Sequence, residues 1–379
     1  MTSSTITTTH PTLDPYQLGE LQLANRLVVA PMTRVSAEPD GTPTQEMADY
    51  YREFATGGFG LVITEGIYTD AAHAQGYLRQ PGLVTEGHVT GWRAVVEAVH
   101  EAGVPVIAQL MHAGALSQGH PLGHETIAPS PVQPLSRMLE EYGGEGAWAV
   151  PREAGDGDIA AVVAGFVAAA AKAREAGFDG VEIHGANGYL LDQFLTDYTN
   201  QRTDGYGGDV AARVRLMAEI VAAVVAGAPA GFLVGVRLSQ TKVNDFIYRW
   251  PGGSDDAEII FAALGAAGAN YLHVASEGRD FIETARFPDG RTITAVAKDV
   301  SGLPVIANGG MHDLHQAADV LTGGHGDLLS LGRGALANPD LPQRVASGDA
   351  LDAFDHALIT PAATIANSRA SRPAASADR

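Results

Sequence analysis

The sequence predicts an α/β fold, a (β/α)8 TIM barrel with an extended loop excursion after strand 3. Eight short runs rich in β-branched residues each precede a longer Ala/Glu/Arg-rich run with helical spacing. The strand candidates are almost continuously apolar, which is typical of strands covered on both faces and therefore of parallel pairing. An open doubly wound sheet is the alternative, but such sheets usually have fewer strands.

The predicted strands, in chain order, are RLVVAPM (26–32), GLVITEG (60–66), PVIAQLM (105–111), DGVEIHG (179–185), FLVGVRLS (232–239), NYLHVAS (270–276), PVIANGG (304–310) and DLLSLGR (327–333). The predicted helices follow them at 44–56, 88–102, 157–176, 209–226, 255–267, 291–300, 313–322 and 338–346. Gly103, Gly177 and Gly268 stand just past three helix candidates, where a left-handed cap favours glycine. We expect a single domain over 1–360 and a disordered Ala/Ser/Pro-rich tail over 361–379.

Composition excludes several classes of protein. The chain of 379 residues has a formal net charge of −20, which argues against nucleic acid and anionic membrane surfaces as partners. The absence of cysteine excludes disulfides, a thiolate nucleophile and Cys-ligated metal centres. The first residues lack a signal-peptide pattern, and the apolar run 159–171 is too short to span a membrane. We expect a cytoplasmic protein, either a monomer or a homo-oligomer.

Polar residues gather at the carboxyl ends of the predicted strands. In a barrel these ends share one rim, where catalytic residues converge. Two long loops, 112–155 and 186–208, leave the same rim. The polar residues are Thr33, Glu65, Gln109, His184, Arg237, Asn308 and Arg333.

The ends of the last two strands predict a phosphate site. Gly309 and Gly310 end the seventh strand, and Gly332 and Arg333 end the eighth. Glycines let backbone N–H groups approach an anion, and the arginine adds a fixed cation. Barrels commonly bind phosphate at these two loops, although the glycines alone are also compatible with tight turns.

Gln109 and Arg237 are expected to point into the barrel mouth. A buried arginine is costly unless it meets an electron-rich partner. That partner is either an internal carboxylate, Glu65 or Glu182, or a heterocycle with carbonyl and imine acceptors. Together with a phosphate tail, a heterocycle of this kind fits flavin mononucleotide (FMN).

The spacing H-x-x-N-x-Y at His184, Asn187 and Tyr189 indicates chemistry at the end of the fourth strand. An imidazole and an amide can together hold one developing oxyanion, and a nearby phenol can donate a proton. The alternatives are a hydrogen-bonded structural histidine and a tyrosine that only packs against Leu191 and Phe194.

These residues carry a resemblance to a known family. HGANGYLLDQFL (184–195), followed by TNQRTDGYGG (199–208), resembles the Old Yellow Enzyme family of FMN-dependent ene-reductases. The resemblance runs from about Leu21 to about Val345 in one order. It is supported by APMTR (30–34), ITEG (63–66), QLMHAG (109–114), VRLS (236–239) and LGRGALANPDL (331–341).

The resemblance implies a (β/α)8 barrel with non-covalent FMN at the strand ends and NADPH or NADH as co-substrate. His184 and Asn187 match the pair that binds the substrate's activating oxygen, and Tyr189 matches the proton donor. Thr33 matches the residue that tunes the reduction of the flavin. Gly66 matches the position whose backbone lies beside the flavin ring. Gln109 and Arg237 match the residues that contact the pyrimidine side of that ring. The implied cofactor-binding set is Pro31, Met32, Thr33, Gly66, Gln109, Arg237, Gly309, Gly310, Gly332 and Arg333.

The chain departs from the family pattern at three places. DVAAR (209–213) stands where the family often has S-x-E-N-R, and Thr33 and Val35 stand where one branch has Cys and Tyr. The stretch 240–253 is longer and more aromatic than the family pattern, which fits either a reshaped pocket or an interface. Phe246, Tyr248 and Trp250 are expected to pack rather than to stack on a cofactor, and the position of their loop is also compatible with a lid.

The remaining histidines are not expected to be catalytic. His112, His120 and His124 lack the register of a metal site, so we expect no metal. His273 is expected to lie in the core or behind the site.

The sequence thus predicts an enzyme that reduces activated C=C bonds of α,β-unsaturated carbonyl or nitro compounds with NAD(P)H by a ping-pong mechanism. No G-x-G-x-x-G separates a strand from a helix, which favours one site shared by nicotinamide and alkene. Two alternatives remain: a flavin-free barrel lyase or isomerase acting on a phosphorylated substrate, and a protein that binds FMN without turnover.

Overall fold

The eight predicted strands form a closed parallel barrel, so the predicted fold class is confirmed. The computed structural model describes residues 10–119, 123, 125–275, 281 and 285–372. Around the barrel run β3 (Leu27–Val29), β4 (Leu61–Tyr68), β5 (Val106–Met111), β8 (Gly180–Asn187), β9 (Leu233–Lys242), β10 (Tyr271–Val274), β11 (Val305–Asn308) and β12 (Leu328–Leu331), which pairs with β3.

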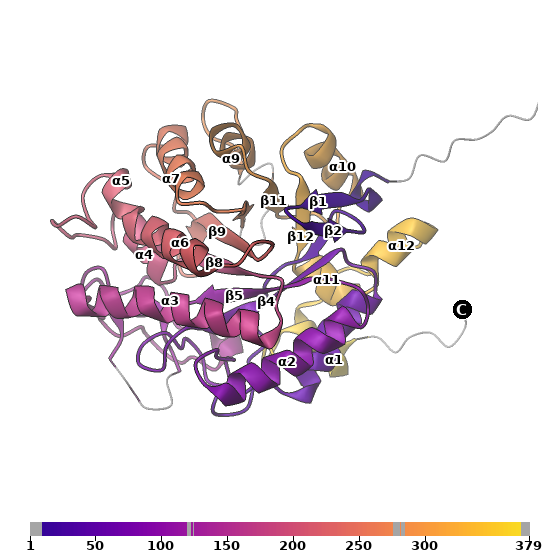
Figure 1. Cartoon of the computed structure of the whole chain (residues 1–379), viewed down its shortest axis with the longest axis horizontal. Helices are drawn as coiled ribbons and strands as arrows, with labels where there is room; N and C mark the ends of the chain where they lie inside the picture. Colours follow the sequence, from indigo (N-terminus) through magenta and orange to yellow (C-terminus); the bar gives the residue numbers. More distant parts are fainter. Residues whose placement is uncertain (1–9, 120–122, 124, 276–280, 282–284, 373–379) are drawn as a thin grey trace, which may run out of the picture.

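Helices surround the strands in chain order, as Figure 1 shows by the colour sequence from α1 to α12. They are α1 (Gln45–Thr56), α2 (Glu86–His100), α3 (Asp156–Ala176), α5 (Val210–Arg213), α6 (Arg215–Gly227), α7 (Ser254–Ala266), α9 (Ile293–Ser301), α10 (Leu314–Thr322) and α12 (Leu341–Ser347). The segment predicted as one helix over 209–226 is divided into α5 and α6. Gly103, Gly177 and Gly268 adopt φ values of 75°, 98° and 93°, the left-handed conformation expected past these helices.

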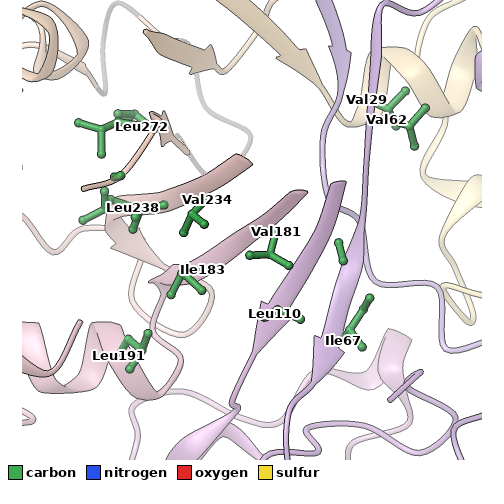
Figure 2. Close-up of a cluster of buried hydrophobic side chains, with 14 of the residues drawn as sticks. Val29, Val62, Ile67, Leu110, Val181, Ile183, Leu191, Val234, Leu238 and Leu272 are labelled. Atoms are coloured by element: carbon green, nitrogen blue, oxygen red, sulfur yellow. The ribbon is translucent and has the colours of Figure 1, made fainter. Parts of the chain in front are cut away.

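Two hydrophobic layers hold the barrel together. The larger layer lies between strands and helices, and Figure 2 shows part of it, including Val62, Val181 and Leu272. The smaller layer contains the first residues of several strands, among them Leu61 and Leu233. A hairpin of β1 (Tyr16–Leu18) and β2 (Leu21–Leu23) packs against this layer and covers the amino ends of the strands. The carboxyl ends are therefore where the barrel can hold a ligand.

Several short elements lie outside the barrel strands and the helices that surround them. They are η1 (Pro11–Leu13), η2 (Gly114–Leu116), β6 (Ile127–Ala128), η3 (Glu140–Tyr142), β7 (Arg152–Glu153), α4 (Leu190–Leu195), α11 (Arg333–Ala337) and η4 (His356–Leu358). The predicted excursion 112–155 contains η2, η3 and the β6–β7 pair. None of the helices in the described part of the chain has the length and apolar character of a membrane span.

The expectation of a disordered tail over 361–379 is wrong for its first part. Helix α13 (Ile365–Ser371) lies within this stretch, and Ile365 and Ser368 are buried. The Arg34 guanidinium donates a 2.7 Å hydrogen bond to the Thr364 carbonyl and a second one to the Ser368 hydroxyl. An Ala/Ser-rich segment is ordered here because a buried cation needs its acceptors. Residues 373–379 lie outside the described residues.

Candidate active site

A cavity of about 600 Å³ opens at the carboxyl ends of the strands. All of the residues predicted for catalysis or cofactor binding line it, although they come from different strands and from the loops that follow strands. They are Pro31, Met32, Thr33, Gly66, Gln109, His184, Asn187, Tyr189, Arg237, Gly309, Gly310, Gly332 and Arg333. The structure thus brings these residues together, while their individual roles remain predictions.

Asn187 owes its position to a bulge at the end of β8. The register with β9 shifts between Gly185 and Asn187, and Asn187 adopts φ 67°, a conformation that asparagine tolerates better than most residues. Its backbone N–H donates a 2.8 Å hydrogen bond to Ser239 Oγ. The next N–H, of Gly188, donates a 2.7 Å hydrogen bond to Asp192 Oδ2. These bonds fix the turn that separates His184 from Tyr189.

His184 and Asn187 each keep a buried polar atom without an internal partner. Among the described residues, His184 Nδ1 and Asn187 Oδ1 have no hydrogen-bond partner. Burial, with the nearby Arg237 cation, lowers the pKa of His184 to about 3, so its imidazole is neutral at pH 7. Unpaired buried polar groups cost free energy, and at the wall of a cavity they indicate a ligand.

Tyr189 is next to His184 and is largely buried. The two ring centroids lie 5.1 Å apart. The Tyr189 hydroxyl is hydrogen-bonded to the hydroxyl of Tyr77, and both rings belong to one hydrophobic cluster with Val35, Leu116 and Trp148. The alternative in which Tyr189 packs only against Leu191 and Phe194 does not match this environment, since those two residues belong to the layer between strands and helices.

A hydrogen-bond network lies behind Gln109 and Arg237. Gln109 Nε2 donates a 2.8 Å hydrogen bond to Glu182 Oε1, and His273 Nδ1 is 2.9 Å from Glu182 Oε2. Arg237 Nη1 lies 2.9 Å from His273 Nε2. Burial raises the pKa of Glu182, but His273, Arg237 and the hydrogen bonds outweigh burial and hold the pKa below its usual value. The network confirms the expectation that His273 lies behind the site.

The glycine loops form the other end of the cavity. Gly309 and Gly310 have φ values of 120° and 66°, which an L side chain rarely adopts, so glycine is required there. Gln316 Nε2 holds the loop through a 2.9 Å hydrogen bond to the Gly309 carbonyl. The Arg333 guanidinium carbon stands 5.6 Å from the centroid of the Phe354 ring. The two loops line the cavity with glycine backbone and with the Arg333 side chain, a combination that suits an anion.

Glu65 is the strand-end residue that does not reach the cavity. Its carboxylate accepts hydrogen bonds from the Arg34 backbone N–H, at 2.9 Å, and from Tyr51, at 3.2 Å. Burial raises the pKa of Glu65 to about 7, although Arg34 and Tyr51 oppose the shift. The expectation that it shares the rim is wrong, because β4 has a bulge between Ile63 and Gly66. Glu65 instead supports the segment that carries Thr33.

Loop residues complete the cavity wall, and sequence reasoning did not identify most of them. Leu139, Glu141 and Tyr142 come from the excursion 112–155, and Val243 comes from the stretch 240–253. The C-terminal segment adds Phe354, Ile359 and Ala363. These residues have no motif, and only their membership of long rim loops could have indicated them.

The aromatic stretch 240–253 has a divided role. Phe246 lines the cavity and is half exposed, whereas Trp250 is buried against Phe261 with ring centroids 6.0 Å apart. Tyr248 lies over the Lys242 ammonium, 4.7 Å from nitrogen to centroid. The expectation of packing therefore holds for Tyr248 and Trp250 but not for Phe246.

The remaining predictions concern DVAAR (209–213) and the histidines. Arg213 Nε donates a 2.8 Å hydrogen bond to the Leu195 carbonyl and so ties α5 to the loop after β8. His112 is buried with Nε2 at 3.3 Å from Asp70 Oδ2, while His120 and His124 lie outside the described residues. Over the described ranges, no group of three or more His, Asp or Glu residues is arranged to hold a metal ion.

Comparison with known proteins agrees with this geometry. Residues 12–352 match the model of the NADH:flavin oxidoreductase / NADH oxidase family. The 12-oxophytodienoate reductase 1 of Oryza sativa subsp. japonica is 35% identical over 355 residues, which cover 91% of this chain and 88% of the relative. The NADH oxidase of Thermoanaerobacter brockii is 32% identical over 341 residues, 88% of this chain and 50% of the relative.

Solved structures give the same result. Morphinone reductase in complex with tetrahydroNAD superposes with a TM-score of 0.83 at 31% identity, covering 97% of this chain and 99% of that chain. The old yellow enzyme homologue from Zymomonas mobilis superposes with a TM-score of 0.80 at 31% identity, covering 90% and 94%. With a family match over most of its length, the chain belongs to the NADH:flavin oxidoreductase / NADH oxidase family, the Old Yellow Enzyme family, and is a flavin-dependent oxidoreductase.

Proposed function

We propose that this protein is an FMN-dependent ene-reductase that uses NAD(P)H to reduce C=C bonds activated by a carbonyl or nitro group. One observation carries the proposal: His184 and Asn187 line the cavity together with the Tyr189 phenol, and within the described residues each keeps a buried polar atom without a hydrogen-bond partner. Two neutral hydrogen-bonding groups and an acid at one place suit a substrate that develops an oxyanion and then needs a proton.

The residues of the cavity fit FMN. The left-handed glycines of the loop after β11, together with Gly332 and Arg333, suit the phosphate, because backbone N–H groups and a guanidinium are its usual partners. Gln109, Arg237 and Thr33 would hold the flavin ring through hydrogen bonds. When bound, FMN supplies the redox chemistry by accepting a hydride from the nicotinamide and giving it to the alkene in a second reaction, which is a ping-pong sequence.

The substrate's carbonyl or nitro oxygen would lie between His184 and Asn187. Because the pKa of His184 is held at about 3, the imidazole binds this oxygen as a neutral hydrogen-bond donor and does not titrate near neutral pH. The amide nitrogen of Asn187 would supply the second donor. The hydrogen bonds that the Asn187 and Gly188 N–H groups donate to Ser239 and Asp192 keep the turn from moving when charge develops.

Tyr189 would give its proton to the α-carbon of the alkene. The phenol loses one proton in this step and recovers one from solvent before the next turnover. NADPH or NADH would occupy the same cavity in the preceding half-reaction, because the sequence has no separate dinucleotide-binding motif.

Absorbance spectroscopy tests the proposal. The purified protein should show the bands of oxidised flavin, and titration with a phenol should add a long-wavelength charge-transfer band as the phenolate is held over the ring. A protein that stays colourless with added FMN would contradict FMN as the cofactor. A yellow protein whose flavin is not reduced by NADPH or NADH in stopped-flow measurements would contradict the nicotinamide half-reaction.

A further inference from the structure

We propose that Tyr77 is a positioning residue for proton transfer. Its phenol would donate a hydrogen bond to the Tyr189 oxygen and stabilise the negative charge that develops there as Tyr189 gives up its proton. The inference deepens the proposed function and rests on Tyr189 acting as the proton donor.

Tyr77 is well placed to contact Tyr189, but it is not placed to contact the substrate directly. It lies in the connection between β4 and α2, is fully buried, and is not one of the residues that line the cavity. Its hydroxyl is hydrogen-bonded to the Tyr189 hydroxyl. Tyr77 therefore acts on the substrate only through Tyr189.

The segment around Tyr77 is held rigidly by its own hydrogen bonds. Gln75 Nε2 donates to the Tyr77 carbonyl at 2.9 Å, and the Gly76 N–H donates to Gln80 Oε1 at 2.7 Å. The Gln118 N–H reaches the Gly76 carbonyl at 2.8 Å and joins this segment to the loop after β5. A donor fixed in this way needs little reorganisation when charge appears on its partner.

The direction of the hydrogen bond follows from the chemistry. If Tyr189 directs its O–H at the alkene carbon, its oxygen is left to accept, so Tyr77 must be the donor. Burial, with the neighbouring phenols of Tyr189 and Tyr142, raises the pKa of Tyr77 well above its usual value, and Tyr77 keeps its proton throughout. The proton that reaches carbon comes from Tyr189 and is replaced from solvent.

The test is a cycle of three variants, Tyr77→Phe, Tyr189→Phe and the double variant, followed by stopped flow at the flavin band. Tyr77→Phe should slow flavin reoxidation by 2-cyclohexenone about tenfold to a hundredfold, the range for losing one hydrogen bond to a charged group. Flavin reduction by the nicotinamide and the dissociation constant of a bound phenol should not change. The double variant should be no slower than Tyr189→Phe, because the hydrogen bond acts only through Tyr189.

Tyr68→Phe is a matched control, since this buried phenol donates a 3.0 Å hydrogen bond to the Asp40 carbonyl and does not line the cavity. It should reoxidise like the parent. If Tyr189→Phe is slowed but Tyr77→Phe reoxidises at the parental rate, the proposed role of Tyr77 is overturned and the role of Tyr189 stands. Additive slowing in the double variant would also overturn the role of Tyr77, because packing would then be the cause. A parental rate in Tyr189→Phe would instead refute the proton-donor assignment within the proposed function.

Discussion

Replacing Lys242 by methionine tests the buried ion pair that supports the Asn187 turn. Lys242 Nζ lies 2.7 Å from Asp192 Oδ1, and the two side chains are 2% and 0% exposed. The other carboxylate oxygen of Asp192 accepts the Gly188 N–H. Removing the ammonium leaves a buried carboxylate unpaired, which costs about 3–5 kcal/mol. We therefore expect the free energy of unfolding in urea to fall by this amount at neutral pH.

The pH dependence of this loss has a definite sign. Burial already raises the pKa of Asp192 above its usual value, and losing Lys242, which opposes that shift, should raise it further. A carboxyl whose folded pKa exceeds its unfolded pKa stabilises the protein at low pH, and that contribution is lost as pH rises towards the folded pKa. The deficit of Lys242→Met should consequently be smaller at about pH 5 than at about pH 8.

Two comparisons make the experiment decisive. In the double variant Asp192→Asn, Lys242→Met, the amide oxygen still accepts from Gly188 and no charge is left unpaired, so most of the stability should return. Lys172→Met removes a pair whose Glu86 partner is 77% exposed, and it should cost at most about 1 kcal/mol. The reasoning is refuted if Lys242→Met unfolds at the parental urea concentration, or if the double variant is as unstable as the single one.

Three other variants test the remaining assignments. Arg333→Ala removes a charge-assisted contact worth about 1.5–3 kcal/mol and should lose FMN on dialysis; retention equal to the parent's would contradict a phosphate site there. Replacing His184 and Asn187 together by Ala should abolish phenol binding and alkene reduction in a protein that stays yellow, since each donor is worth about 2.7–4 kcal/mol; an unchanged phenol titration would show that the pair faces elsewhere. The Glu65 carboxyl, with a pKa raised by burial to about 7, stabilises the folded state below its unfolded pKa and loses this contribution as pH rises through 7. In Glu65→Gln, the free energy of unfolding in urea should depend less on pH over that range. A pH dependence as steep as the parent's would mean that another group titrates.

The barrel and its motif residues were predictable because each depends on local sequence. Apolar runs such as GLVITEG are long enough to identify β4, and polar residues that directly follow a strand reach the rim through the topology alone. Glu65 shows the limit of this reasoning. The bulge between Ile63 and Gly66 contains Glu65 and turns its side chain out of the cavity, and a bulge leaves no mark in the hydrophobic pattern.

The residues that sequence reasoning missed act through contacts distant in the chain. Tyr77 and Tyr189 are 112 residues apart, and neither neighbouring sequence indicates that their hydroxyls meet. Helix α13 looks like a tail by composition, but its Thr364 carbonyl satisfies a buried arginine 330 residues away. Sequence motifs can therefore identify the residues that line the cavity. The residues that control the conformation and charge of those side chains become visible only in the tertiary structure. Substitutions at Tyr77 and Lys242, which belong to none of the sequence motifs, therefore test contacts that only the tertiary structure reveals.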